Sequence, residues 1–433
     1  MSKKFARPAF VLGVGMSAYG NPGENPELDN MTERELLAWA CQEAYDDAGI
    51  RARDVEKIVY GQVAVWYQGQ AFAGLAPIPA WTGCEGKPFS HHDEACATGY
   101  HVIGEAVEAV ASGKYDIVLA CAQETPNTFY KSTDLPFNTY PAVEYLLGED
   151  GGKPWMRNAD FGMLDSAYHR WDGAMMGGGM EAGGMYYMDE YGKSLNEVDD
   201  YLNAICYNQR YNASHNPSAA FRESYDDIAK KLGFANAMEY LKSDHNPLVS
   251  KFVRRAGLLK HVTGAGACII CSEDVAKSAK SRAIQVLGTG FSTIPFHVAN
   301  SYKKMNKYVA ESAYEQSGVK PEEIEYLQCT DMTSTEVLHS VEDMGYLPAG
   351  EGWKYHMENR TTFEGDKPIN TNGGSQNNGH VLGATGLTAL TEVVLQMRGE
   401  AGQRQIKKAP HTTMMRGHGG SHTTAAFIFR NQE

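Results

Sequence analysis

Cys96 and His380 are the residues of this 433-residue chain whose surroundings most clearly indicate chemistry. Cys96 lies where the polar residues 91–94 give way to small ones, and apolar residues at helical spacing follow from Val102 to Val110. A helix that begins here points its positive end at the thiol and lowers the thiol pKa, which favours the nucleophilic thiolate. A buried structural cysteine is the alternative, because free cysteines are among the most buried residues.

His380 lies in a second glycine-rich loop, residues 370–386, that repeats features of the first. Ala384-Thr385-Gly386 repeats Ala97-Thr98-Gly99, and in both places an apolar helix follows and ends at a glycine. The similarity extends upstream, since residues 44–60 match residues 313–328 in pattern. We therefore expect two α/β halves, each running helix, strand, glycine-rich loop, central helix and strand, with their central helices packed together.

These motifs resemble those of the thiolases. Asn372-Gly-Gly, four residues, Gly379-His380, two residues and Gly383-Ala-Thr-Gly resemble the thiolase Gly-His-Pro loop, with Val381 where proline usually stands. The Cys96 loop resembles the acylated cysteine of that family, and residues 416–420 resemble its C-terminal glycine loop. Residues 207–217 and 335–345 fit the sterol-carrier-protein-type branch. The resemblance covers the whole chain and implies an α/β thiolase fold, in which two pseudo-symmetric halves stack as five layers (αβαβα) and a loop domain is inserted.

The resemblance also implies domain limits. Residues 1–123 are expected to form the first part of the N-terminal half, residues 124–258 the inserted loop domain, residues 259–280 the last strand of the N-terminal half, and residues 281–433 the C-terminal half. Residue patterns predict strands at 10–16, 57–65, 115–122, 262–270, 324–329 and 423–429, and helices at 32–47, 308–318 and 384–398. Residues 195–211 form an amphipathic segment of the insertion. Gly13-Val-Gly15 lacks the correctly placed third glycine of a dinucleotide-binding loop.

In a thiolase site Cys96 would attack a carbonyl and His380 would take the thiol proton. The N–H groups of Cys96 and of Gly419 or Gly420 are the expected oxyanion donors, because glycine permits a close approach. The resemblance implies an acyl-CoA acyltransferase that uses coenzyme A as co-substrate and needs no metal or other bound cofactor.

Two residues depart from the thiolase pattern. Met415 stands where many thiolases have a second cysteine that handles the proton at the cleaved carbon, and a thioether cannot do acid/base work. His418 is our candidate to replace that cysteine, with a surface histidine as the alternative. Thr330 stands where the branch has a histidine beside the thioester oxyanion, and its hydroxyl could hold a water there. These departures favour an unusual substrate.

The first functional hypothesis is cleavage of a 3-oxoacyl-CoA through an acyl-cysteine, with a bulky or aromatic substrate such as benzoylsuccinyl-CoA. A second is carbon–carbon bond formation, either acetoacetyl-CoA synthesis or acylation of an aromatic ring, because the same groups run both directions. A third is a non-catalytic subunit of a thiolase-like complex. Retro-aldol relatives need no nucleophilic thiol, so Cys96 argues against that reaction.

Composition limits the partners. A net charge of −14 opposes nucleic-acid binding, and no apolar run approaches the roughly 20 residues of a membrane span. Eight scattered cysteines do not form a secreted disulfide pattern, and Cys268 and Cys271 fit a buried strand. We expect a cytoplasmic protein. The resemblance implies acyl-CoA and CoA as ligands, a homodimer through the edge of the core sheet, and a small partner subunit with a zinc ribbon and an oligonucleotide-binding-type barrel.

Overall fold

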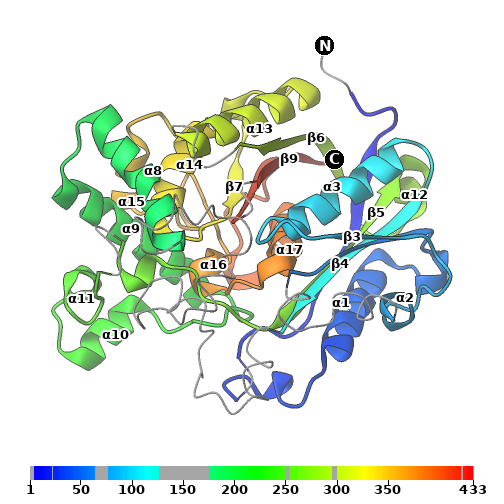
Figure 1. Ribbon diagram of the computed structural model, residues 1–433, viewed down its shortest axis with the longest axis horizontal. Helices are drawn as coiled ribbons and strands as arrows, with labels where there is room; N and C mark the ends of the chain where they lie inside the picture. The colour runs from blue at the N-terminus through cyan, green and yellow to red at the C-terminus, as the bar shows by residue number, and fades with distance from the viewer. Residues whose placement is uncertain are drawn as a thin grey trace.

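The framework of the molecule is a nine-stranded sheet (Figure 1). The computed structural model describes residues 4–21, 23–63, 77–125, 175–248, 253–294, 300–420 and 423–432. In sheet order the strands are β3 (Phe89–His92), β2 (Lys57–Gly61), β4 (Ile117–Glu124), β5 (Gly264–Ser272), β1 (Ala9–Met16), β6 (Ile284–Thr293), β9 (Thr423–Asn431), β8 (Thr412–Gly419) and β7 (Tyr326–Cys329).

The sheet contains two halves that mirror each other. They meet where β1 pairs with β6 over three residues on each strand, Ala9–Val11 against Ile284–Val286. Outward from this junction the first half runs β1, β5, β4, β2, β3, and the second runs β6, β9, β8, β7. Corresponding strands therefore take corresponding places, and the repeat predicted from the sequence is a structural repeat.

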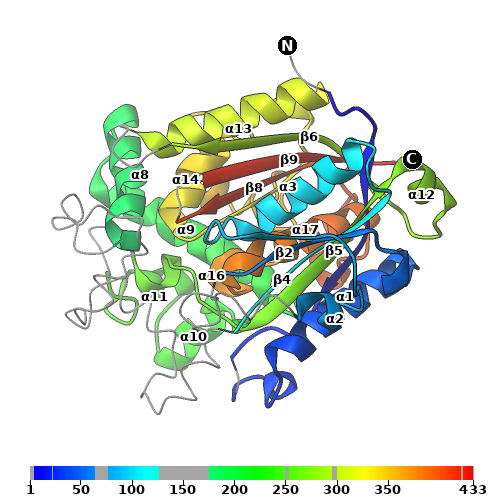
Figure 2. The same cartoon turned by 45° about the vertical axis from the view of Figure 1, so that its right-hand side comes forward.

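Helices separate the two halves into layers (Figure 2). Helix α1 (Glu33–Ala48) covers the outer face of the first half, and α13 (Ser301–Ser317) covers the outer face of the second. Helices α3 (Thr98–Ala111) and α17 (Thr385–Arg398) lie between the halves and pack on each other. The order is helix, sheet, helix pair, sheet, helix, as the five-layer expectation requires.

Glycines on β1 and β6 allow the outer helices to lie close to the sheet. A Cβ atom at Gly13 or Gly15 would lie within 2.5 Å of the backbone of α1. A Cβ atom at Gly288 or Gly290 would lie within 2.4 Å of the backbone of α13. Gly13 and Gly15 thus serve helix packing rather than a nucleotide, and their counterparts in the second half do the same.

The central helices touch at the glycines of the repeated triplet. A Cβ at Gly99 would lie 2.7 Å from the carbonyl oxygen of Gly383, and one at Gly386 would lie 2.5 Å from the amide nitrogen of Tyr100. The residues that cap the two helices have nearly identical backbones, with φ −83° and ψ −8° at Ala97 and φ −86° and ψ −7° at Ala384. The local symmetry of the sequence therefore becomes the symmetry of the helix pair.

Most predicted elements are confirmed, with shifted ends. The capping box of Thr32 and Glu35 begins α1, and Gly49 follows it at φ 68°. Helix α13 begins at Ser301, earlier than expected, and β2 ends at Gly61. Strands β3, β6 and β8 were not predicted. Strand β3 lies in a turn-rich stretch, and β8 includes the expected glycine loop. That loop is the end of β8, which pairs with β9 up to Gly419 and Thr423.

The remaining helices surround this framework. Between β4 and β5 the chain forms α8 (Met175–Tyr191), α9 (Leu195–Ser214), α10 (Tyr225–Leu232) and α11 (Ala237–Lys242). The shorter helices are α2 (Ile78–Trp81), α12 (Glu273–Ser278), α14 (Ser334–Asp343), α15 (Gly352–Met357) and α16 (Gly374–Asn377). Helix α9 packs on α14, α15 and α16, so the insertion is attached to the second half beside the loop that carries His380.

Candidate active site

Cys96 and His380 meet at the start of the central helices. The Nε2 atom of His380 lies 3.0 Å from Sγ of Cys96, and both side chains are buried. Each residue comes from the loop before one of the paired helices, so the approach of α3 to α17 brings them together. This distance allows direct proton transfer between the thiol and the imidazole.

The turn before Cys96 has a strained backbone. Ala95 has φ 50°, a left-handed conformation that residues other than glycine rarely adopt. Thr98 stabilises the turn, because its hydroxyl donates to Ala95 O at 2.7 Å and accepts from the Glu94 N–H at 2.8 Å. Leu382, the counterpart of Ala95 in the second half, has φ 36°. Strain of this kind is common at functional sites.

His380 is fixed by a neighbouring strand and by α17. Its N–H donates to Lys260 O at 2.7 Å, and its carbonyl accepts from Val262 N at 3.1 Å. Its Nδ1 lies 3.1 Å from Oγ1 of Thr385. For Nε2 to accept the thiol proton, Nδ1 must carry the ring hydrogen and donate it to Thr385. Thr385 therefore orients the base, a role that the Ala-Thr-Gly repeat did not reveal.

Burial dominates the electrostatics of the pair. It raises the pKa of the Cys96 thiol to about 12, against N–H groups of Gly420 and Cys96 that favour the thiolate. Burial also lowers the pKa of His380 to about 4. The expectation that the helix end lowers the thiol pKa is therefore wrong, because desolvation of the thiolate outweighs the dipole. The resting site holds a neutral thiol beside a neutral imidazole.

The predicted oxyanion donors lie around the thiol. The N–H groups of Gly420 and Cys96 donate to Sγ of Cys96. Gly419 packs against the Cys96 turn so closely that a Cβ would lie 2.5 Å from Glu94 O and 2.6 Å from Ala97 N. The hairpin of β8 and β9 thus lies directly on the nucleophile loop.

The side chain of His418 points to the face of β8 opposite the Cys96 loop. Gly417 and Gly419, its neighbours, face Tyr100 and Ala97, and side chains alternate along a strand. The imidazole of His418 instead lies with Glu336, at 3.2 Å from Nδ1 to Oε1, and its ring centroid is 5.0 Å from that of Tyr302. The structure therefore does not support His418 as an acid/base group beside Cys96, nor does it leave the ring on the surface.

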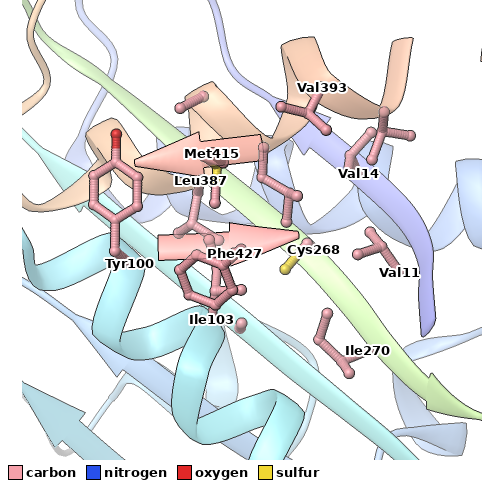
Figure 3. Packing of buried hydrophobic residues seen from close by; sticks show 14 of the residues in the cluster. Val11, Val14, Tyr100, Ile103, Cys268, Ile270, Leu387, Val393, Met415 and Phe427 are labelled. Carbon is pink, nitrogen blue, oxygen red and sulfur yellow. The ribbon is translucent and has the colours of Figure 1, made fainter. Parts of the chain in front are cut away.

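Thr330 makes hydrogen bonds to neighbouring elements, and Met415 packs in the core. The Thr330 hydroxyl lies 3.2 Å from the Tyr100 hydroxyl and 3.3 Å from Arg416 O, and it accepts from His418 N at 3.1 Å. It is therefore occupied by protein groups rather than free to hold a water. Met415 points into the apolar core beside Leu387 (Figure 3).

A buried charge cluster behind β8 was missed in the sequence. Glu336 of α14 pairs with Arg416 and with His418, and Arg416 also donates to Asn306 Oδ1 at 3.1 Å. Burial alone raises the pKa of Glu336, but Arg416 and His418 more than offset it and hold the pKa at about 2. The field of this carboxylate reaches Cys96 and His380 and raises the pKa of both.

Asp331 connects β7 to the His380 loop. Its carboxylate accepts from the N–H groups of Ser375 at 2.6 Å and Gln376 at 3.2 Å, at the start of α16. Burial raises its pKa to about 8, with those N–H groups acting in the other direction. The Asp331 side chain therefore positions the loop from inside the core.

Metal sites and membrane-spanning helices were sought in the described ranges. No three His, Cys, Asp or Glu side chains there come together as a metal site. No helix within those ranges combines the length and apolar character of a membrane span. His422, a second histidine near the glycine loop that we expect at the surface, lies outside the described ranges.

A cysteine thiol 3.0 Å from a histidine imidazole, between two pseudo-symmetric α/β halves, is an arrangement suited to covalent acyl transfer. Family models agree: residues 9–137 match the thiolase N-terminal domain, and residues 298–431 match the thiolase C-terminal domain-like family. Together they cover more than half of the chain, which belongs to the thiolase superfamily and is a thiolase-type acyltransferase.

Named relatives extend over almost the whole chain. An acetyl-CoA acetyltransferase of Methanothermobacter thermautotrophicus is 28% identical over 97% of this chain and 98% of its own length. Sterol carrier protein 2 of Bos taurus is 26% identical over 92% of this chain and 68% of its own length. These relatives agree with the sterol-carrier-protein-type resemblance.

Solved structures show the same fold. The human mitochondrial 3-ketoacyl-CoA thiolase superposes with a TM-score of 0.66 at 16% identity and covers 99% of this chain and all of its own. The Ltp2-ChsH2(DUF35) aldolase superposes with a TM-score of 0.69 at 17% identity over 99% of both chains. At such identities the agreement concerns the fold alone.

Proposed function

We propose that this protein cleaves a 3-oxoacyl-CoA with coenzyme A through an acyl group on Cys96. The observation that carries the proposal is the 3.0 Å contact between the thiol and the His380 imidazole. Because the resting thiol is neutral, it needs a base at the moment of attack, and Nε2 of His380 is the group in reach.

The first half-reaction follows from this geometry. The thiol proton passes to His380 as Sγ bonds to the keto carbon, and the N–H groups of Cys96 and Gly420 donate hydrogen bonds to the oxyanion. The carbon–carbon bond then breaks, which leaves the shortened acyl group on Cys96 and releases the enolate of the acyl-CoA that keeps the original thioester. We assign the return of the proton to that carbon to His380, since His418 faces Glu336.

In the second half-reaction the thiol of coenzyme A gives its proton to His380 and attacks the acyl-cysteine. Cys96 leaves as thiolate and recovers the proton from the imidazolium. The same groups run carbon–carbon bond formation in reverse, and the name of the archaeal relative, acetyl-CoA acetyltransferase, fits transfer in either direction.

We also propose a bulky or aromatic acyl group, of which benzoylsuccinyl-CoA is one example. Support comes from the departures at Thr330 and Met415, which remove two polar groups expected in an ordinary acetyl-CoA site. The domain limits stated above, with residues 124–258 as the insertion, belong to the same proposal.

A small partner subunit and a homodimer complete the proposed assembly. The solved aldolase of similar fold carries in its name a DUF35 protein, ChsH2, beside Ltp2, which supports a second subunit here. Strand β3 ends the sheet with one edge unpaired in the described structure, which suits pairing with a second copy.

Mass spectrometry after incubation with a panel of 3-oxoacyl-CoA thioesters tests the proposal. We expect an acyl adduct on Cys96, discharged by free coenzyme A. Cys96→Ala should lose the adduct and lower turnover by more than about a thousandfold, because the nucleophile is removed. Cys329→Ala, at another buried cysteine, is the control that should keep both. Turnover by Cys96→Ala at the wild-type rate would reject the mechanism.

A further inference from the structure

His261 is a buried imidazole that packs on the catalytic base. Its ring centroid lies 5.2 Å from that of His380, with the planes at 63° in an edge-to-face contact. The residue is 7% exposed. The backbones of the two residues are also joined as a parallel bridge. His261 therefore packs directly against the ring and backbone of His380.

The extended segment that carries His261 directs the side chain of Lys260 away from the site. Lys260 Nζ donates to the carbonyl oxygen of Gln376 at 2.8 Å and lies 5.6 Å from the ring centroid of Phe221. Successive side chains of an extended chain point to opposite sides, so Lys260 faces the insertion while His261 faces His380. Two backbone hydrogen bonds to His380 fix this register.

The proposed reaction needs a hydrogen-bond donor beyond those already assigned. The N–H groups of Cys96 and Gly420 lie at Sγ, where they serve the oxygen of the carbonyl under attack. A second oxyanion forms on the thioester oxygen of the departing enolate, and it needs its own donor. Thr330 is occupied by Tyr100, Arg416 and His418, and His418 faces Glu336.

We propose that the imidazole N–H of His261 donates to the thioester oxygen of this enolate. The inference rests on the function proposed above and adds a catalytic residue to it. A neutral imidazole is an effective electrophile for a developing enolate, because its N–H donates without giving up the proton. Burial and the neighbouring His380 keep His261 neutral, since both lower its pKa well below the ordinary value.

All proton transfers in this step take place between Cys96, His380 and the substrate. Cys96 gives its proton to His380 and bonds to the keto carbon. The bond between the 2- and 3-carbons breaks, and its electron pair moves onto the thioester oxygen at His261. His380 then returns the proton to the 2-carbon, so His261 keeps its own proton throughout.

Two reactions of the same enzyme separate this role from a structural one. Cleavage of a 3-oxoacyl-CoA passes through the enolate. Exchange of labelled coenzyme A into the product acyl-CoA needs Cys96 and His380 but breaks no carbon–carbon bond. The cleavage probe is the 3-oxoacyl-CoA of the panel that the wild type cleaves fastest. The exchange probe is the acyl-CoA that forms from its acyl-cysteine. Both are used on protein purified with any subunit that co-elutes.

His261→Phe keeps an aromatic ring against His380 and removes the N–H. We expect its kcat/KM for cleavage to fall about a hundredfold, the usual loss for one oxyanion donor, with exchange within about twofold of wild type. His261→Gln retains an N–H and should cleave within about tenfold of wild type. The control is His356→Gln, another buried histidine, on α15, which should leave both reactions unchanged.

The inference is overturned if His261→Phe cleaves as fast as the wild type, or if exchange falls as far as cleavage. Should His261→Phe not fold, His261→Leu and His261→Gln are compared in the same two assays under the same criteria. A wild-type protein that performs neither reaction would contradict the proposed function itself, which is a different outcome.

Discussion

At the scale of residues, the site depends on a neutral pair rather than on a preformed thiolate. Cys96 and His380 are both desolvated, so charge appears only when the proton moves between them. The backbone at Ala95 and Leu382 shows how this pair is presented, because both residues take positive φ just before the central helices. Only the surrounding packing can hold an alanine and a leucine in that conformation.

The thiol pKa predicts how Cys96 reacts with iodoacetamide. Burial raises that pKa to about 12. At any pH below this value, the thiolate fraction rises about tenfold for each unit by which the pH increases. We expect the alkylation rate of Cys96, followed by peptide mass mapping from about pH 6 to about pH 9.5, to keep rising and to be lowest at acid pH. Cys96→Ala identifies the labelled peptide. A plateau near neutral pH would show a lowered pKa and contradict the structure.

At the scale of elements, two helices related by a pseudo-two-fold bring the halves of the site together. Their contact is made by Gly99 and Gly386, where neither backbone has room for a Cβ. The hairpin of β8 and β9 then holds the Cys96 loop from outside, and residues 260–262 hold the His380 loop. The helix crossing is therefore the element on which the 3.0 Å contact depends.

Substitutions at Gly99 in α3 and at Gly113, two residues beyond its end, test this crossing. Gly99→Ala places a Cβ 2.7 Å from Gly383 O and should lower the free energy of unfolding by about 3 kcal/mol through overpacking. Gly113→Ala, at φ 82° with no atom within 4 Å of the new Cβ, should cost only about 1 kcal/mol of left-handed strain. Urea unfolding measures both. Equal effects would show that the crossing is not tightly packed.

At the scale of the whole molecule, the sheet ends at β3 on the side of the nucleophile loop. Ile58 N–H donates to Pro88 O and Gln62 N–H donates to His92 O, so the even-numbered residues of β3 face β2. The backbone groups of Phe89 and His91 therefore face outward, where a second copy could pair. A dimer through this edge would place two nucleophile loops close to each other.

Replacing one outward N–H tests the assembly. His91→Pro removes the N–H and leaves the pairing with β2 intact, so we expect the mass of the particle to shift from dimer toward monomer. His91→Ala retains the N–H and is the matched control, which should stay dimeric. Mass photometry across a dilution series distinguishes the two. A His91→Pro protein that remains a dimer would place the interface elsewhere.

The sequence by itself determined features that depend on near neighbours and on repetition. The capping box of Thr32 and Glu35, the glycine stops and the repeated Ala-Thr-Gly triplet predicted helices and two matching halves. They also identified Cys96 and His380, because each is the reactive residue of one loop in the repeat. Such signals act over a few residues, so they can be recognised before the chain folds.

Only the tertiary structure decided which way side chains face and how far they are desolvated. His418 and His261 are both histidines on extended segments near the site, yet pairing register turns the first toward Glu336 and the second toward His380. The raised pKa of Cys96 has the same origin, since burial is contributed by many distant segments together. Strand register and desolvation are set by long-range packing, and a one-residue shift in pairing would exchange the two faces.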